Sequence, residues 1–241
     1  MACGAEGMGV TRWCICNADD FGAMRGVNRG VIEAHRAGVL TSASLMVNRP
    51  GSAEAAGLAA AHADLGVGLH VNLTNEGDPV VDVEDVEACR REVDRQVAAF
   101  HELMGRPPTH LDVHHNLHRL PNLAPLFRAA ADELRVPLRE HSPVRYFSSF
   151  YAVWDDGETH PEHVGVDSLL AMVAGFGPGV TELSCHPGYV DDELDSPYAL
   201  QRELELATLL DPRLPEGLER LGVRLVSYRD LPRLLEDGVA L

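Results

Sequence analysis

Short apolar runs alternate with longer amphipathic stretches along most of the chain. Short apolar runs suit buried strands, and stretches with apolar residues three or four positions apart suit helices. The apolar runs predict strands over residues 13–18, 40–47, 67–73, 110–114, 180–185 and 223–226. The amphipathic stretches predict helices over residues 27–36, 52–62, 84–104, 121–134, 166–174 and 196–210, with a short helix after the last strand. Because this alternation continues without a linker, it predicts a single α/β domain of residues 1–241 with a parallel sheet.

Turn and cap residues predict where several of these elements begin and end. The Asp-Asp-Phe-Gly segment at residues 19–22 is expected to form a turn after the first strand. Ser52 and Ser196 are expected N-caps, and Pro197 suits a first helical position. Residues 142–165 are expected to be an ordered loop, and residues 1–10 a disordered N-terminal extension. The two carboxylates at residues 19–22 replace the glycine-rich phosphate loop of a dinucleotide-binding fold, which counts against that fold.

Side chains that can bind metals or transfer protons gather at the predicted carboxyl ends of four strands. In parallel α/β folds these strand ends share one edge of the sheet, where the chemistry takes place. The side chains are Asp19 and Asp20 after the first strand, His70 in the third, Asp112, His114 and His115 at the end of the fourth with His118 just beyond, and His186 after the strand at 180–185.

Two imidazoles and one carboxylate from this group suit a catalytic divalent metal that keeps positions open for water and substrate. His114 alternates with Asp112 and His110, so all three are expected on one face of the fourth strand, where burial is costly without partners. His70 and Asp20 are expected at the same end of the sheet. Taken singly, His70 also fits a core histidine, and the two aspartates also fit a solvated turn.

Three further residues are candidates for catalysis beside the metal. Adjacent carboxylates cannot point the same way, so Asp19 can turn toward the attacking water while Asp20 binds the metal. His186 precedes Pro187, is held extended, and is a candidate general acid. Arg139 could pair with a site carboxylate and keep it charged, although its spacing alone favours a surface arginine.

Four residues are candidates for substrate contacts. His115 and His118 could face the substrate, or could simply begin a solvated loop. Tyr151 and Trp154 could form a wall on which a sugar stacks, although aromatic residues in a loop also form small cores of their own.

Composition narrows the possible partners. The chain has 241 residues, 20 Lys+Arg and 37 Asp+Glu, for a net charge of −17, which argues against nucleic acid and anionic membranes. No uninterrupted apolar stretch reaches the length of a membrane span, and no secretory signal is evident. The five scattered cysteines favour a reduced, cytoplasmic protein.

Five segments together resemble the YdjC-like carbohydrate deacetylases, a family that includes chitooligosaccharide deacetylases and hopanoid-associated members. The resemblance runs in order from about Arg12 to Leu235. The segments are Asn-Ala-Asp-Asp-Phe-Gly at 17–22, Gly-Leu-His-Val-Asn-Leu-Thr at 68–74, Pro-Thr-His-Leu-Asp-Val-His-His at 108–115, Cys-His-Pro at 185–187 and Ser-Tyr-Arg-Asp at 227–230.

The resemblance implies a distorted (β/α) barrel of the polysaccharide-deacetylase type, with parallel strands and outer helices. It also implies a hydrolase that acts on the C–N amide bond of an N-acetylated amino sugar, oligosaccharide or glycoconjugate, with metal-bound water as the attacking group. Position by position, Asp20, His70 and His114 match the metal ligands, Asp19 the base and His186 the acid, while Arg139 matches an arginine beside the catalytic carboxylate. The implied metal is magnesium, although the donor set also suits zinc or another transition metal. Similar proteins suggest a homodimer.

One departure from the family bears on the substrate. The loop at 78–83 is short, which removes part of one substrate wall and puts a chitooligosaccharide in question more than the chemistry. Two other functions share the same ligands: a phosphoesterase on a similar barrel, and a non-catalytic protein that binds sugars through a metal. A phosphoesterase needs more cationic residues than the predicted site offers.

Overall fold

Parallel strands form the centre of the molecule in the computed structural model, which describes residues 11–75, 79–154, 157–190 and 198–236. The sheet has seven strands in the order β4-β3-β2-β1-β6-β5, and β7 pairs with the start of β1. Every strand pair is parallel. The strands are β1 (Arg12–Phe21), β2 (Ser42–Leu45), β3 (Gly66–Val71), β4 (Leu111–Val113), β5 (Arg145–Phe147), β6 (Gly179–Cys185) and β7 (Val223–Leu225).

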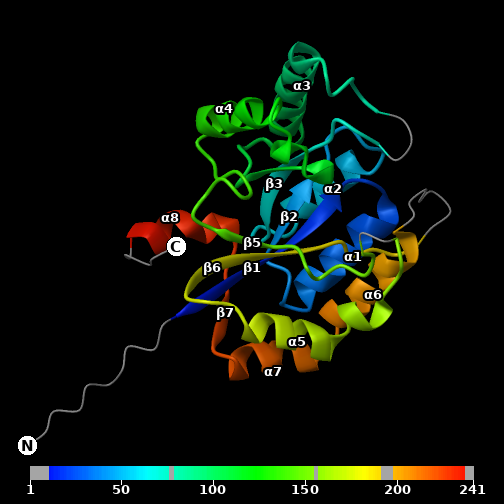
Figure 1. The fold of residues 1–241 in the computed structure, drawn as a ribbon, viewed down its shortest axis with the longest axis vertical. Helices are drawn as coiled ribbons and strands as arrows, with labels where there is room; N and C mark the ends of the chain where they lie inside the picture. Colours follow the sequence, from blue (N-terminus) through cyan, green and yellow to red (C-terminus); the bar gives the residue numbers. More distant parts are fainter. Residues whose placement is uncertain (1–10, 76–78, 155–156, 191–197, 237–241) are drawn as a thin grey trace, which may run out of the picture.

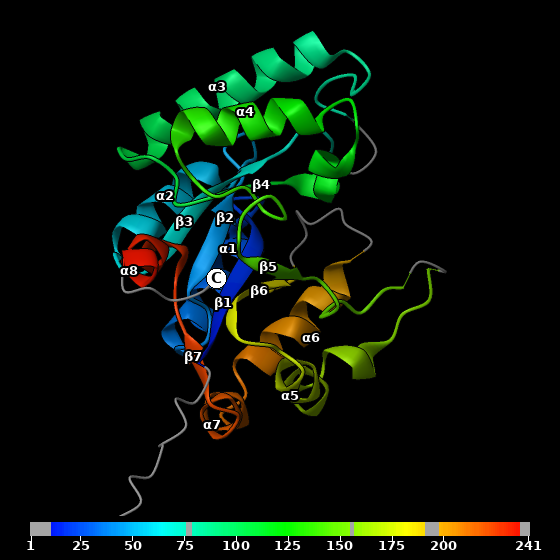
Figure 2. The same cartoon turned by 60° about the vertical axis from the view of Figure 1, so that its left-hand side comes forward.

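Helices surround this sheet on its outer side (Figure 1). They are α1 (Arg25–Arg36), α2 (Ser52–Ala60), α3 (Val86–Met104), α4 (Ala124–Leu134), α5 (Val166–Ala174), α6 (Ala199–Leu209), α7 (Arg213–Arg220) and α8 (Leu231–Glu236), with the 3-10 turns η1 (His114–Arg119), η2 (Pro161–Val164) and η3 (Tyr228–Asp230). In Figure 2, α3 and α4 lie side by side at one end of the molecule, and α5 and α7 lie at the other. The predicted distorted barrel of parallel strands and outer helices is confirmed. None of the described helices is long and apolar enough to cross a membrane.

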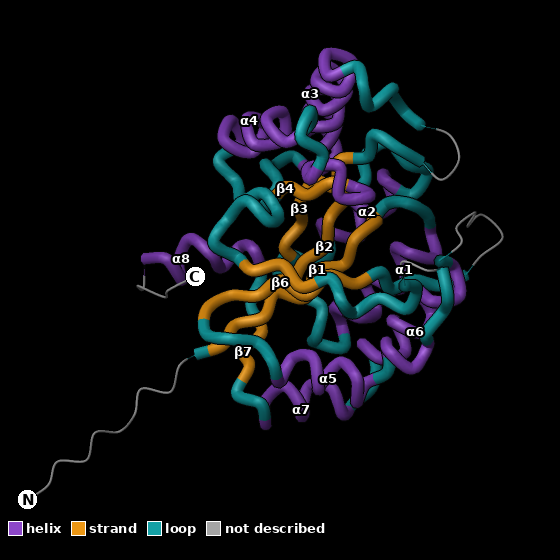
Figure 3. The backbone as a smooth tube through the Cα atoms, viewed as in Figure 1, coloured by secondary structure: helices purple, strands orange, loops and turns teal. Residues whose placement is uncertain are grey.

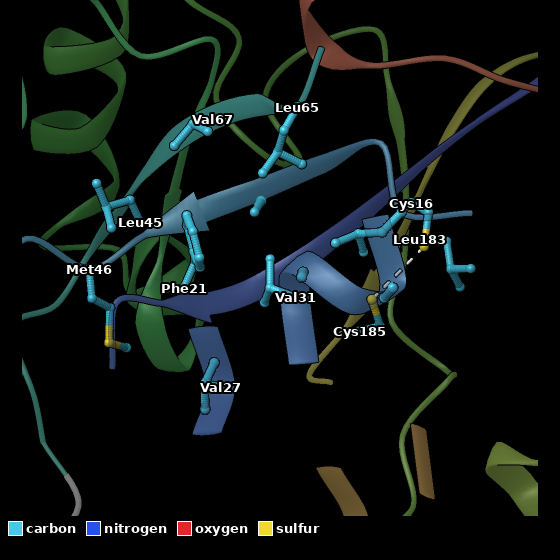
Figure 4. Close-up of a cluster of buried hydrophobic side chains, with 14 of the residues drawn as sticks. Cys16, Phe21, Val27, Val31, Leu45, Met46, Leu65, Val67, Leu183 and Cys185 are labelled. Atoms are coloured by element: carbon cyan, nitrogen blue, oxygen red, sulfur yellow. Dashed lines mark hydrogen bonds between the residues drawn. The ribbon is translucent and has the colours of Figure 1, made fainter. Parts of the chain in front are cut away.

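Apolar packing holds α1 against the sheet. Val27 and Val31 on α1 are fully buried and belong to the same hydrophobic cluster as Phe21 and Leu45 of the sheet, part of which Figure 4 shows. No side chain caps the N-terminus of this helix. Since each fully buried valine or leucine contributes about 1.5–3 kcal/mol, packing rather than capping determines where α1 lies.

The first strand differs from its prediction in a way that shapes the site. β1 continues through Asp19 and Asp20 to Phe21, so the prediction of a turn at residues 19–22 is wrong. The pairing with β2 shifts register between Ala18 and Phe21, and Asp20 has a φ of 65°. An extra residue on one strand of a pair bends that strand and re-aims its side chains.

Other differences are shifts of element boundaries or missed short elements. The fourth strand has three residues, because His114 already begins η1, whose residues His115 and Asn116 have positive φ. The region expected to be a loop at 142–165 contains β5 and η2, and α7 was not expected (Figure 3). Gly51 rather than Ser52 precedes α2 as its cap residue. The helix start expected at Ser196 and Pro197, the extension at 1–10 and part of the loop at 78–83 lie outside the described residues.

Candidate active site

The bulge in β1 turns two consecutive aspartates toward different partners. Asp19 and Asp20 are both buried. Asp19 accepts two hydrogen bonds from Arg139, Nη1 to Oδ2 at 2.8 Å and Nη2 to Oδ1 at 2.7 Å. Burial alone would raise the pKa of Asp19, but the charge and hydrogen bonds of Arg139 hold that pKa below its ordinary value. Asp19 is therefore an ionised carboxylate in a nearly dry site.

Asp20 lies instead beside two histidines. Its Oδ1 is 3.2 Å from His70 Nε2 and 3.2 Å from His114 Nδ1, and those two nitrogens are 3.4 Å apart. Oδ1 is buried, yet no described group donates a well-directed hydrogen bond to it. A buried carboxylate oxygen that has no well-directed donor among the described residues and faces two imidazole nitrogens has the surroundings expected of a cation ligand. The three residues thus form a group that could hold a metal ion.

The orientation of His70 is set by a carboxylate on the next strand. His70 Nδ1 lies 2.7 Å from Asp112 Oδ1, which leaves Nε2 directed at Asp20. Burial alone would lower the pKa of His70, but the negative charge and hydrogen bond of Asp112 raise it to about 10. A ligand histidine commonly has a carboxylate on its other ring nitrogen, and Asp112 occupies that position here.

Arg139 contacts three carboxylates at once. The residue is buried, so the interpretation of Arg139 as a surface arginine, which its spacing favours, is wrong. Besides Asp19, its Nη2 lies 2.8 Å from Asp112 Oδ2 and 2.6 Å from Glu182 Oε1. Its guanidinium also lies over the ring of Tyr146, 4.7 Å from the centroid. A single guanidinium therefore compensates three buried carboxylates.

The residue after Arg139 connects its loop to the turn that carries His114. Glu140 has a φ of 61° and accepts hydrogen bonds from Arg119, while His118 Nε2 lies 2.7 Å from Glu140 Oε2. His118 is fully buried in this contact and does not line the cavity at the site. The geometry gives His118 a structural position and offers no support for a substrate contact.

Arg202, on α6, is a partner of Asp20 that the sequence interpretation missed. Its Nη2 lies 2.5 Å from Asp20 Oδ2, and only 6% of the residue is exposed. Burial alone would raise the pKa of Asp20, but the Arg202 charge and the two histidines hold it well below its usual range.

His186 also lies close to Asp19. Its Nε2 is 3.8 Å from Asp19 Oδ2, and its Nδ1 is 3.9 Å from Glu205 Oε1. Burial lowers the pKa of His186 to about 4, even though Asp19 and Asp20 favour its charged form. Glu205, also missed, accepts hydrogen bonds from Tyr198 Oη and the His186 backbone, both at 2.5 Å. Burial raises the pKa of Glu205 to about 8.

One cavity of about 360 Å³ is lined by several of these residues, among them Asp19, Asp20, His70, His114, His186 and Arg202. Its lining includes the predicted contacts His115 and Tyr151. Tyr151 stacks on the ring of Tyr198 with centroids 4.2 Å apart. Trp154 is not in the lining; it is 49% exposed and stacks on His160. The predicted residues that line the cavity are Asp19, Asp20, His70, His114, His115, Tyr151 and His186.

The Ser-Tyr-Arg-Asp segment at 227–230, to which its spacing along the chain assigns no function, lies behind the site. Tyr228 Oη donates to Glu182 Oε2 at 2.6 Å, and its ring stacks on His110 with centroids 3.9 Å apart. His110 is fully buried, and its ring nitrogens contact Thr109 and Ser44, so it is part of the buried support.

A family model described as "YdjC-like protein" matches residues 14–220. A carbohydrate deacetylase from Geobacillus stearothermophilus is 38% identical, with 93% of this chain and 100% of the relative aligned. A chitooligosaccharide deacetylase from Yersinia enterocolitica is 33% identical, with 90% of this chain and 98% of the relative aligned.

Solved structures give the same picture of the fold. A protein from Enterococcus faecalis, proposed to cleave cellobiose phosphate, superimposes with a TM-score of 0.77 at 28% identity, covering 92% of this chain and 99% of that one. A family 4 carbohydrate esterase from Streptomyces lividans superimposes with a TM-score of 0.56 at 13% identity, covering 92% and 95%. At that identity the second match supports the fold alone.

Proposed function

Because this chain belongs to the YdjC-like protein family, we propose that it is a carbohydrate deacetylase, which hydrolyses the amide bond of an N-acetylated sugar. The observation that carries the proposal is the juxtaposition, in one cavity, of a possible cation site with an ionised carboxylate and an imidazole. The relatives named above act on carbohydrates, and the aromatic face of Tyr151 in the same cavity suits contact with a sugar ring.

Asp20, His70 and His114 would hold a divalent cation. The ligand chemistry fits, since Asp20 Oδ1 is buried, faces both imidazoles and receives no well-directed hydrogen bond from the described residues. A cation held there would polarise the acetamide carbonyl and lower the pKa of water. The family resemblance suggests magnesium, whereas two imidazoles and one carboxylate also suit zinc and other transition metals.

Asp19 is the proposed general base. Its carboxylate is ionised because Arg139 lies against both oxygens, so it is ready to accept a proton from the attacking water. Arg139 acts here by keeping Asp19 charged and by fixing its orientation.

His186 is the proposed general acid for the departing amine. Burial lowers the pKa of His186 to about 4, so its imidazole is neutral near pH 7 and must first take up the proton that Asp19 accepts from water; Asp19 Oδ2 lies 3.8 Å from His186 Nε2. Once protonated, the imidazole is a strong proton donor to the departing amine. A proton taken from water by Asp19 can thus pass through His186 to the amine.

The experiment that tests the proposal measures acetate release from a panel of N-acetylated sugars and chitooligosaccharides. Metal-free protein would be assayed with magnesium, zinc, manganese or cobalt added back. We expect release that requires a cation and is abolished in His114→Ala, while His101→Ala, at an exposed position on α3, behaves as wild type. Asp19→Asn should lose turnover but keep cation binding; full activity in this variant would eliminate Asp19 as the base.

Two results would redirect the proposal. Hydrolysis of nitrophenyl phosphate without acetate release would favour a phosphoesterase. Sugar binding that requires a cation but yields no acetate would favour a non-catalytic sugar-binding protein.

A further inference from the structure

Arg202 reaches the site from a helix, α6, and not from a strand end. Its Nη2 lies 2.5 Å from Asp20 Oδ2. Its main-chain oxygen accepts a hydrogen bond from Gly188, which lies two residues beyond His186 (N to O, 3.3 Å). The helix that supplies Arg202 is thereby connected to the segment that follows β6.

The guanidinium of Arg202 makes few of the hydrogen bonds that are open to it. Its Nε and Nη1 are buried and have no hydrogen-bond partner among the described residues. Arg139, by contrast, uses Nε, Nη1 and Nη2. Buried donors without acceptors cost stability, so a purely structural role explains Arg202 poorly. Within the described part of the chain, its guanidinium makes one directed hydrogen bond, which is to Asp20.

The two oxygens of Asp20 therefore have different surroundings. Oδ2 is occupied by Arg202, whereas Oδ1 faces His70 and His114 without a directed donor. A carboxylate on a flexible side chain could otherwise rotate and offer either oxygen, or both, to a cation.

We propose that Arg202 is a positioning residue that holds Asp20 so that Oδ1 alone is presented to the cation. The inference rests on the cation site of the proposed function. Hydrogen bonds to ligand carboxylates are a usual part of metal sites, and their loss typically weakens metal binding about 10–100-fold.

The test measures cation binding directly, by calorimetry with cobalt and zinc on metal-free protein, together with the visible absorption spectrum of bound cobalt. Arg202→Met removes the charge and the donor while keeping most of the side-chain volume. We expect it to bind cobalt about 10–100-fold more weakly, with an altered spectrum, because Asp20 is no longer held to one oxygen. Arg202→Lys keeps a donor for Oδ2 and should recover most of the affinity and the spectrum.

Two further variants separate the possible results. Arg145→Met removes a guanidinium that bonds Gly177 and Thr181 outside the cavity, and should leave binding unchanged. Asp20→Asn should abolish binding at the site. If wild-type protein binds no cation, the metal centre itself is overturned. If wild type binds and Asp20→Asn does not, but Arg202→Met keeps the wild-type affinity and spectrum, only the role of Arg202 is overturned. Should Arg202→Met fail to fold, the same comparison is made with Arg202→Lys and Arg202→Gln.

Discussion

A divalent cation must compete with a proton for His70, so cation affinity should rise steeply with pH. Asp112 lies against Nδ1 and Asp20 against Nε2, and the pKa of His70 is raised to about 10. At pH 7 the protonated form then outnumbers the neutral form by about 1000 to 1, and removing that proton costs about 4 kcal/mol. Because a ligand histidine must be neutral, this cost is subtracted from the binding free energy.

The expected result is an apparent dissociation constant that falls about tenfold for each pH unit between pH 6 and 8. Calorimetric titration of metal-free protein with cobalt, repeated in buffers of different ionisation enthalpy, should report about one proton released per cation bound. Asp112→Asn removes the negative charge that stabilises the imidazolium, so its affinity should depend less on pH. Binding by wild type that releases no proton and does not change with pH would refute the reasoning.

The same protonation affects the stability of the metal-free protein. The pKa of His70 is higher in the folded protein than its ordinary value of 6.5, so its contribution to stability is fully present below pH 6.5 and is lost as pH rises toward 10. Chemical denaturation of metal-free protein should show a free energy of unfolding that falls over this range. Asp112→Asn should show a smaller fall.

Three other predictions follow from buried contacts. A methyl group at Gly68 would lie 2.4–2.6 Å from the ring of buried His110, so Gly68→Ala should lower the free energy of unfolding in urea by about 1–3 kcal/mol. Gly57→Ala, on α2 with open space around it, should raise that free energy by about 0.5–1 kcal/mol, and the opposite order would contradict the clash. The pKa of Glu205 is raised from 4.5 to about 8, so the free energy of unfolding should fall as pH rises through this range. Glu205→Gln should reduce that fall, and thermal melts at several pH values would measure the difference. Arg139→Met leaves buried carboxylates without a counter-charge and should lower the free energy of unfolding by about 3–5 kcal/mol at pH 8. The loss should be smaller at pH 5, where the carboxylates can take up protons, and an equal loss at both pH values would argue against this cause.

The residues at strand ends were predictable because parallel topology brings them together. His70 lies near the end of β3, while His114 and His186 directly follow β4 and β6. Once the alternation predicted a parallel sheet, these side chains had to share one edge. The position of Arg139 was different: pairing with a site carboxylate was one of two readings, its spacing alone favoured the surface, and the family resemblance favoured the carboxylate.

Other parts of the site could not be read from strand ends. Arg202 and Glu205 lie on α6 and are buried with Leu206 and Leu209, which occupy the same face of the helix. Charged residues on an otherwise apolar helical face were the available signal. Glu182, inside the apolar strand β6, was a similar signal. β5 was missed because three residues are too few for a periodic pattern to appear.

The bulge in β1 explains how two adjacent aspartates can have separate functions in one cavity. In a regular strand Asp19 and Asp20 would face opposite sides of the sheet. The register shift and the positive φ of Asp20 bring both carboxylates to the same edge, where Arg139 pairs with one and Arg202 with the other. Each carboxylate has its own guanidinium, so both remain ionised although they are buried side by side. Two neighbouring carboxylates with different partners can serve different chemical functions. The bulge is therefore as much a part of the candidate active site as the side chains it carries.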